Sequence, residues 1–325
     1  MTENTTNMMA DTVRVLPVNG IEAMQEGVKG ASVEPTQLGK GAVRGKLTFA
    51  DLGGSDLTIG RLSGSLAING PLSQDRLVLG VLLEANDTSR QWSTSTRTGD
   101  VGVFPAMTEH ASRYSGQSGY LTISADLDDI RERAKFHEIR LPRKFWRRGQ
   151  MYRGSINAMR HLLKTSQSIE AALTDSRHSI SIPSAAASAR REIIDAFLYN
   201  FDGAVGLEQL RHVAFRDPQR VVRQAQEYIW QHSHRAVSLE EICGDLRLSG
   251  RSLHRAFHSV LDISPAAYAR NWRLTQVRRH LAQSNGADVS VTEIATRFGF
   301  WELGRFSAQF RALFGELPSQ VLARQ

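Results

Sequence analysis

The sequence of 325 residues contains a single cysteine, Cys243. One cysteine excludes an intramolecular disulfide and any cysteine-rich zinc site, which fits a reducing compartment. No stretch approaches the roughly 18 consecutive apolar residues that cross a bilayer. The polar start, residues 1–11, lacks the basic and apolar regions of a signal peptide, so we expect a disordered tail there. These absences favour a cytoplasmic protein with no membrane partner.

Lysine is absent from the C-terminal third of the chain. From Pro218 to Gln325 there are 14 Arg, no Lys and nine Asp or Glu, a net charge of +5, whereas the other 217 residues carry only +2. The planar guanidinium group forms paired hydrogen bonds with phosphates and guanine edges. This distribution indicates an acidic partner for the C-terminal end.

The N-terminal half shows the apolar–polar alternation of β-structure from about residue 40 to 125. Leu47 and Phe49 are examples, and the run Leu77–Leu83 is almost continuously apolar. Asn69-Gly70-Pro71 is a turn signal. Short strands between Gly, Asn, Asp and Ser predict a sandwich or barrel.

Helical periodicity replaces this alternation near residue 127. We predict helices over about 127–137, 149–164 and 184–200. The apolar stripe of the third helix either forms a dimer seam or packs on its own β-domain. Gly203 and Gly206 then mark a linker over residues 206–217.

The C-terminal region contains an internal repeat of helical pattern. Each unit opens with Ser followed three residues later by Glu, the capping box of a helix start, at Ser238/Glu241 and Ser290/Glu293. The spacing predicts helices over about 239–245 and 250–261, and a second long helix over about 302–314. A short helix, a tight turn and a longer helix form the helix-turn-helix plan.

One long helix is predicted between the two units. Ser264 caps it, Pro265 occupies its first turn, and it continues to about Ser284. At about 1.5 Å per residue it spans roughly 30 Å, close to the roughly 34–36 Å of one turn of B-DNA. It would therefore set the second helix of each unit, about 250–261 and about 302–314, in successive major grooves of DNA. These two helices are called the reading helices below. Three arginines on the long helix either contact phosphates or are solvated: Arg273, Arg278 and Arg279.

The segment from Ser238 to Val321, about 100 residues with its flanks, resembles the AraC/XylS family of bacterial transcription regulators. The motifs that carry the resemblance are Ser249-x-x-x-Leu253-x-Arg255-x-Phe257, Ile263-Ser264-Pro265-x-x-Tyr268, Val291-Thr292-Glu293-Ile294-Ala295-x-x-Phe298-Gly299-Phe300, and Phe306-Ser307-x-x-Phe310-Arg311-x-x-Phe314-Gly315-x-x-Pro318-Ser319. The resemblance implies a seven-helix DNA-binding domain over residues 218–325. It also implies a nucleoid-associated regulator that acts at promoters with RNA polymerase.

The resemblance assigns DNA contacts to the two reading helices. The candidates are Arg251, Ser252, His254 and Arg255 on the first, and Arg305, Ser307 and Gln309 on the second. Arg255 suits a guanine edge, although each arginine could instead contact phosphate or solvent. Gly304 and Ala308 stand where family members often carry polar side chains, which predicts weaker reading by the second helix. We expect Trp301 to pack rather than contact bases.

The region before the linker looks like a cupin-type sensory domain. We predict an α+β chain: a partly disordered segment over residues 1–35, a β-rich effector and dimerisation domain with C-terminal helices over 36–205, and the all-α domain. Gly99-Asp100-x-x-x-x-Pro105-x-x-x-x-His110 resembles a degenerate second cupin motif. Because no cluster of two His and a Glu precedes it, His110 is predicted to be structural or a lone polar group in a pocket, and no metal is expected.

Arg143 and Arg147 are the candidate effector-binding residues. Their spacing resembles the arginine pair of the PilZ cyclic-di-GMP motif, and paired guanidinium groups beside aromatics suit an anionic nucleotide. The alternative is a solvated basic stretch that packs Phe145 and Trp146 inward.

The sequence thus predicts a sequence-specific DNA-binding regulator, an activator and homodimer, controlled by a small-molecule effector of unknown identity. No catalytic residue or cofactor is predicted, because no paired carboxylates, nucleophile elbow or phosphate-binding loop stands out. Two other classes stay open: a cupin-type enzyme fused to a DNA-binding domain, and an architectural DNA-binding protein without an effector.

Overall fold

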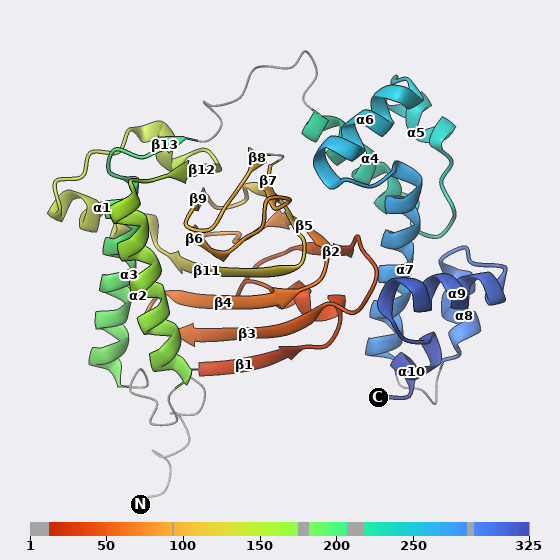
Figure 1. Cartoon of the computed structure of the whole chain (residues 1–325), viewed down its shortest axis with the longest axis horizontal. Coiled ribbons are helices and arrows are strands. Elements are labelled where there is room, and N and C mark those ends of the chain that lie inside the picture. Colours follow the sequence, from red (N-terminus) through yellow and green to blue (C-terminus); the bar gives the residue numbers. More distant parts are fainter. Residues whose placement is uncertain (1–12, 93, 175–181, 207–217, 285–288, 325) are drawn as a thin grey trace, which may run out of the picture.

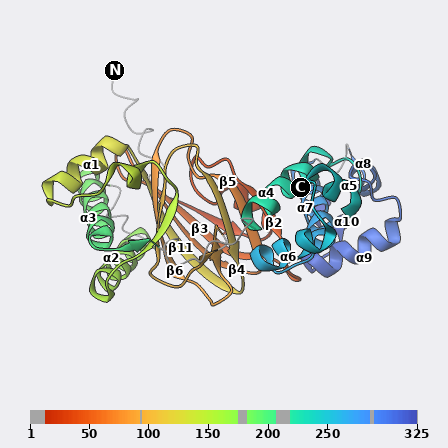
Figure 2. The same cartoon turned by 90° about the horizontal axis from the view of Figure 1, so that it is seen from above.

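The computed structural model describes residues 13–92, 94–174, 182–206, 218–284 and 289–324. The chain forms a β-rich domain with three helices, followed by an all-α domain (Figure 1). Viewed from above, the sheets lie between the helices of the first domain and the all-α domain (Figure 2). The predicted α+β class is confirmed. Among the described residues, no helix combines the length and apolar character needed to cross a membrane.

Two antiparallel sheets face each other in the β-rich domain. One has the order β1-β3-β4-β11-β6-β9-β12-β13 and the other β2-β5-β10-β7-β8, an arrangement consistent with a cupin-type domain. The strands are β1 (Val13–Val18), β2 (Glu34–Gln37), β3 (Arg44–Asp51), β4 (Asp56–Ser63), β5 (Leu66–Pro71), β6 (Leu77–Glu84), β7 (Arg90–Gln91), β8 (Thr94–Ser95), β9 (Val101–Phe104), β10 (Glu109–Tyr114), β11 (Gln117–Ala125), β12 (Gln150–Arg153) and β13 (Val205–Gly206).

The larger sheet is buried on both faces, which explains the apolar run in β6. Val78 and Leu82 face the space between the sheets, whereas Leu79 and Val81 belong to the core formed with the helices. These helices are α1 (Leu127–Phe136), α2 (Ile156–Thr174) and α3 (Pro183–Phe201). The apolar stripe of α3 is buried in the same core, so of the two alternatives it packs on its own domain.

Residues 13–35, part of the segment predicted to be partly disordered, contain β1 and the 3-10 helix η1 (Ile21–Glu26), and residues 1–12 lie outside the described part. Two local expectations differ from the structure. The helix expected over 149–164 starts only at Ile156, because β12 uses the preceding residues as a strand beside β9. Asn69-Gly70-Pro71 ends strand β5 and makes no turn. Gly70 has φ +111°, and a Cβ there would lie 2.4 Å from the Ser32 carbonyl oxygen, so only glycine fits where the chain crosses β5.

The all-α domain has seven helices in its described residues, as predicted. They are α4 (Pro218–Gln231), α5 (Leu239–Asp245), α6 (Gly250–Leu261), α7 (Pro265–Gln283), α8 (Val291–Arg297), α9 (Leu303–Phe314) and α10 (Pro318–Leu322). Helices α5 and α6 form the first helix-turn-helix unit, and α8 and α9 form the second. Ser264 caps α7 by accepting a hydrogen bond from the Ala267 amide. The linker predicted over 206–217 lies outside the described residues except for Gly206.

Helix α7 also joins the two domains, because it packs against β2 and η1. Arg278 on α7 is 1% exposed and forms ion pairs with Glu22 of η1 and Glu316. Arg279 pairs with Glu34 of β2 at 2.7 Å. Both guanidinium groups therefore bind protein carboxylates in this structure, and neither alternative considered for them, phosphate contact or solvation, is what the structure shows.

Candidate nucleic-acid interface and effector cavity

The first unit presents a polar face on α6. Ser249 caps the helix by accepting a hydrogen bond from the Ser252 amide at 3.2 Å, and Leu253 and Phe257 fix the opposite face in the core. Arg251 and Arg255 are four residues apart, so they project from the same face, and both are exposed. His254 is half-buried beside them. The structure thus brings three of the candidate DNA contacts together on one surface.

Ser252 differs from these three residues. Its hydroxyl lies 2.9 Å from the Ser249 hydroxyl, and its side chain is half-buried. Its first role in this structure is therefore within the helix cap, and any DNA contact would share the hydroxyl with Ser249.

The second unit presents a poorer polar face on α9. Arg305 is exposed but lies 3.7 Å from the Glu302 carboxylate, while Ser307 and Gln309 are half-buried. Gly304 and Ala308 are exposed and offer no hydrogen-bonding side chain. The expectation that Trp301 packs is wrong: its side chain is 77% exposed, whereas its neighbour Phe300 is buried against Phe306.

The helix caps of the two units also differ. Ser238 and Glu241 form a complete capping box. Ser290 accepts a hydrogen bond from the Glu293 amide, but the Glu293 carboxylate binds Arg297 at 3.2 Å. The second predicted box is therefore only half formed.

The two reading helices lie along the same edge of the all-α domain (Figure 2).

Arg273 of α7 donates a hydrogen bond to the Phe298 carbonyl at 3.2 Å, and its guanidinium lies 4.7 Å from the centre of the Phe300 ring. Arg273 thus fixes the turn of the second unit, and burial lowers its pKa.

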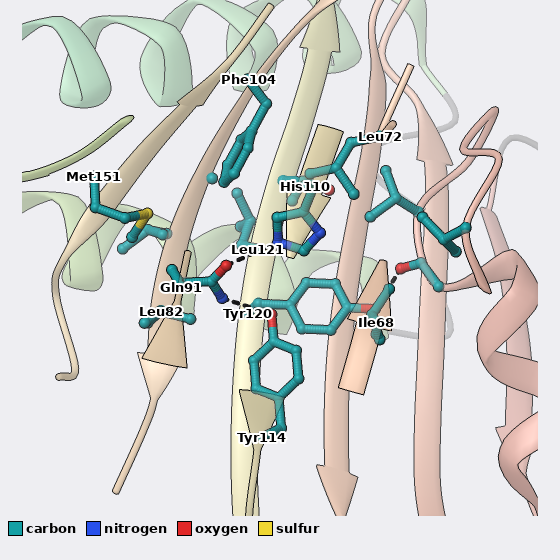
Figure 3. A pocket seen from close by; sticks show the side chains of 16 residues that line it. Ile68, Leu72, Leu82, Gln91, Phe104, His110, Tyr114, Tyr120, Leu121 and Met151 are labelled. Atoms are coloured by element: carbon teal, nitrogen blue, oxygen red, sulfur yellow. Dashed lines mark hydrogen bonds between the residues drawn. The ribbon is translucent and has the colours of Figure 1, made fainter. Parts of the chain in front are cut away.

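A cavity of about 40 Å³, called the inner cavity below, lies between the two sheets (Figure 3). Most of its lining is apolar, with Ile68, Leu82 and Phe104 as examples. Three polar side chains interrupt this lining in one chain: His110 Nε2 lies 2.8 Å from Gln91 Oε1, and Gln91 Nε2 donates to the Tyr114 hydroxyl at 3.2 Å. The position of His110 matches the expectation of a polar group in a pocket.

The hydrogen bonds fix the protonation of His110. Gln91 uses its amide N–H toward Tyr114, so its oxygen accepts the Nε2 proton of His110. Burial lowers the pKa of His110 to about 3, so the ring is neutral. Nδ1 is then an acceptor, and it is buried without a partner among the described residues. The hydroxyl of Thr122, which also lines the cavity, is likewise buried without a partner in the described structure, so the inner cavity offers a small molecule two polar contacts in a mostly apolar lining.

The polar chain was only partly predictable. His110, Ser112 and Tyr114 alternate along β10, a period that puts them on one face, so His110 and Tyr114 could have been paired from the sequence. Gln91 comes from the two-residue strand β7, which gives no periodic signal.

The candidate effector residues lie at the two ends of the 3-10 helix η2 (Arg143–Trp146): Arg143 is its first residue, and Arg147 follows its last. Both are exposed, and together with Arg131 they border a surface hollow of about 330 Å³. Phe145 and Trp146 are buried beneath them. The arrangement agrees with a solvated basic stretch over inward aromatics, and it also leaves three guanidinium groups around one hollow.

The comparisons concern mainly the all-α domain. The family model described as a helix-turn-helix domain matches residues 242–324. The XylDLEGF operon transcriptional activator 1 of Pseudomonas putida is 37% identical over 99 residues, and the activator RhaS of Escherichia fergusonii is 38% identical over 90. These matches cover 30% and 28% of this chain, and only 30% and 31% of the relatives' own length.

Two solved structures resemble the chain more distantly. The AraC-like transcriptional activator CuxR covers 82% of this chain and 96% of its own with 15% identity and a TM-score of 0.42. An AraC-type regulator from Chromobacterium violaceum covers 33% and 92% with 25% identity and a TM-score of 0.31. Neither score supports an argument about ligands. The sequence matches and the seven-helix geometry agree, however, and the C-terminal domain of this chain is an AraC/XylS-type helix-turn-helix domain.

Proposed function

We propose that this protein is a sequence-specific transcription regulator, an activator that binds promoter DNA and acts with RNA polymerase in the cytoplasm as a homodimer. The observation that carries the proposal is the exposed face of α6, where Arg251 and Arg255 project from a domain of the helix-turn-helix type. An arginine on such a helix can bind the O6 and N7 atoms of guanine with both arms of its guanidinium group.

The effector is a small molecule held in the inner cavity. The apolar lining supplies burial, and the unpartnered Nδ1 of neutral His110 accepts one hydrogen bond from the ligand. A ligand there would also touch Val28 and Val33, which lie between η1 and β2, the two elements that contact α7. This gives the effector a physical route to the DNA-binding domain.

A second effector class has one observation in its favour. Arg131, Arg143 and Arg147 surround the hollow at η2, and guanidinium groups in such a cluster suit the phosphates of an anionic, cyclic-di-GMP-like nucleotide. The double variant Arg143→Ala/Arg147→Ala abolishes regulation if this class is right, and His110→Leu abolishes it if the inner cavity is right.

Selection of genomic fragments by the full-length protein tests the regulator proposal. At about 150 mM salt, where phosphate contacts alone bind weakly, wild type should enrich a few fragments that share a bipartite site with about 10 bp between its halves. Arg255→Ala should lose them. Arg191→Ala, which removes an exposed charge from α3, should retain them. Enrichment that Arg255→Ala leaves intact would contradict the role of α6.

A further inference from the structure

A second cavity lies between the β-rich domain and the all-α domain. It measures about 520 Å³ and is bordered by β5 and β10 on one side and by α4 and α6 on the other. We call it the interdomain cavity. Its size is within the range of small-molecule sites. The interdomain cavity has no role in the regulatory function proposed for the inner cavity.

Strand alternation explains why this cavity is separate from the inner cavity. Along β10, His110 and Tyr114 line the inner cavity, whereas Ala111 and Arg113 line only the interdomain cavity. His110 borders both cavities, so the two adjoin at this residue. Ala67 on β5, which pairs with Arg113 in register, already packs into the core of the first helix-turn-helix unit.

Arg113 carries the argument, because its buried charge is incompletely paired. The side chain is 10% exposed, and its Nη2 donates to Asp262 at 3.0 Å, but the Asp262 side chain is itself 62% exposed. Its Nε is buried without a partner among the described residues. A buried N–H without an acceptor is unfavourable, because the group loses its hydrogen bond to water and gains none in return. The site thus lacks an acceptor that a bound oxyanion would supply.

Other groups in the wall point to the same chemistry. The Asn69 side-chain N–H₂ is also buried without an acceptor in the described structure. Arg90, Arg220 and Arg223 add positive charge, against Glu109 and Glu227. The N–H groups of Gln226 and Trp230 are not available to a bound oxyanion, because both approach the Tyr268 hydroxyl. The remaining wall is apolar, with Trp92, Val222 and Leu261 as its larger surfaces.

We propose that the interdomain cavity binds a small molecule that joins an oxyanion to an apolar or aromatic body, with Arg113 as the principal contact. The oxyanion, a carboxylate or a phosphate ester, completes the hydrogen bonds of Arg113 Nε and the Asn69 amide. The apolar body covers Trp92 and Leu261. Since its walls come from both domains, the ligand stabilises their packed arrangement and acts as a second signal beside the effector in the inner cavity.

The test uses calorimetric titration of the full-length protein with three probes of one shape. These are 1-naphthoate, 1-naphthyl phosphate and the uncharged 1-naphthamide, at constant ionic strength in chloride. At least one anion should bind, and the amide at least tenfold more weakly. Preference for the first or second probe identifies a carboxylate or a phosphate ligand. Arg113→Met should weaken anion binding at least tenfold, since it removes the charge and all five N–H donors of the guanidinium group.

A second variant separates binding from a purely structural role of Arg113. Asp262→Asn removes the competing carboxylate but keeps the cavity, so it should tighten anion binding severalfold. It also keeps the test valid if Arg113→Met fails to fold. Four results would overturn the proposal: no binding of either anion at millimolar concentration, equal binding of the amide, unchanged affinity in Asp262→Asn, or a loss of affinity that follows Arg143→Ala/Arg147→Ala. None of these results depends on the DNA selection, so failure of this site leaves the regulator proposal standing.

Discussion

The two helix-turn-helix units share a plan but differ in what they offer to DNA and to the rest of the protein. The first unit exposes Arg251 and Arg255 on α6, whereas α9 exposes Gly304 and Ala308 beside an arginine that lies near Glu302. The polar groups suited to base recognition are therefore concentrated in one unit.

The attachment of the units to the β-rich domain shows the opposite order. Phe306 and Phe310 of the second unit belong to the same hydrophobic core as the residues between the two sheets, and buried Arg278 ties that side to Glu22. In the described residues, Leu38 and Ala67 are the only residues of the β-rich domain in the core of the first unit. The ion pair between this unit and the β-rich domain joins Arg113 to the exposed Asp262. We therefore expect the first unit to contribute most to DNA recognition and the second to contribute most to the position of the all-α domain.

The largest expected effect tests this difference in attachment. Arg278→Met leaves Glu22 without a cation and Glu316 with only its pair to Arg324, so the free energy of unfolding should fall by about 3 kcal/mol. Asp262→Asn removes a carboxylate that is 62% exposed but leaves buried Arg113 with a neutral acceptor, so it should cost less than Arg278→Met. Urea unfolding of both variants at pH 7 gives the two values. Equal losses would remove the distinction between the attachments.

Recognition of DNA should show the reverse order. On the site obtained by fragment selection, Arg255→Ala should weaken binding by about 1–3 kcal/mol and relax the preference for one base pair. Arg305→Ala should cost less and affect all sequences alike, as expected of a phosphate contact. Titrations with the selected site and with single-base variants decide this. A larger loss for Arg305→Ala would assign base recognition to the second unit.

A pH dependence should distinguish the β-rich domain from both units. Unfolded His110 binds a proton near pH 6.5, whereas in the folded protein its pKa is about 3, so the unfolded chain binds more protons between these values. The contribution of His110 is therefore complete above about pH 6.5 and falls as the pH drops. At about 1.4 kcal/mol per pH unit, wild type should lose about 2 kcal/mol more than His110→Gln between pH 7 and 5. Denaturant titrations at both pH values measure the two losses. Equal losses would mean that folded His110 takes up a proton over the same pH range as in the unfolded chain.

The smallest effect concerns helix α9 itself. Nothing lies within 4 Å of a Cβ placed on Gly304, so Gly304→Ala should raise the melting temperature through a gain of up to about 1 kcal/mol. Gly299→Ala is the matched control and should destabilise, because Gly299 has φ +73° and its Cβ would lie 3.0 Å from Arg235 Cα. DNA affinity of Gly304→Ala should stay near that of wild type. A clear gain in affinity would show that α9 reads poorly because it is unstable, and not because it lacks polar groups.

The sequence predicted α5 and α7 within one residue at each end, because the caps Ser238 and Ser264 are local signals. It failed where a distant segment decides the conformation. Residues 150–153 form a strand only because β9 lies beside them, and Gly70 is placed by the chain at Ser32. The docking of Arg278 on Glu22 joins residues 256 apart, a pairing that no local pattern encodes.

Helix α7 carries both reading helices on one continuous rod of 19 residues. A rod of this kind resists twisting, so the angle between the two units about the DNA axis is set before DNA is met. Inserting five base pairs, about half a helical turn, between the two halves of an operator would put one half on the far side of the duplex. Ten inserted base pairs restore the side but exceed the reach of the rod. The length of a single helix would therefore determine both the phase and the separation of the half-sites.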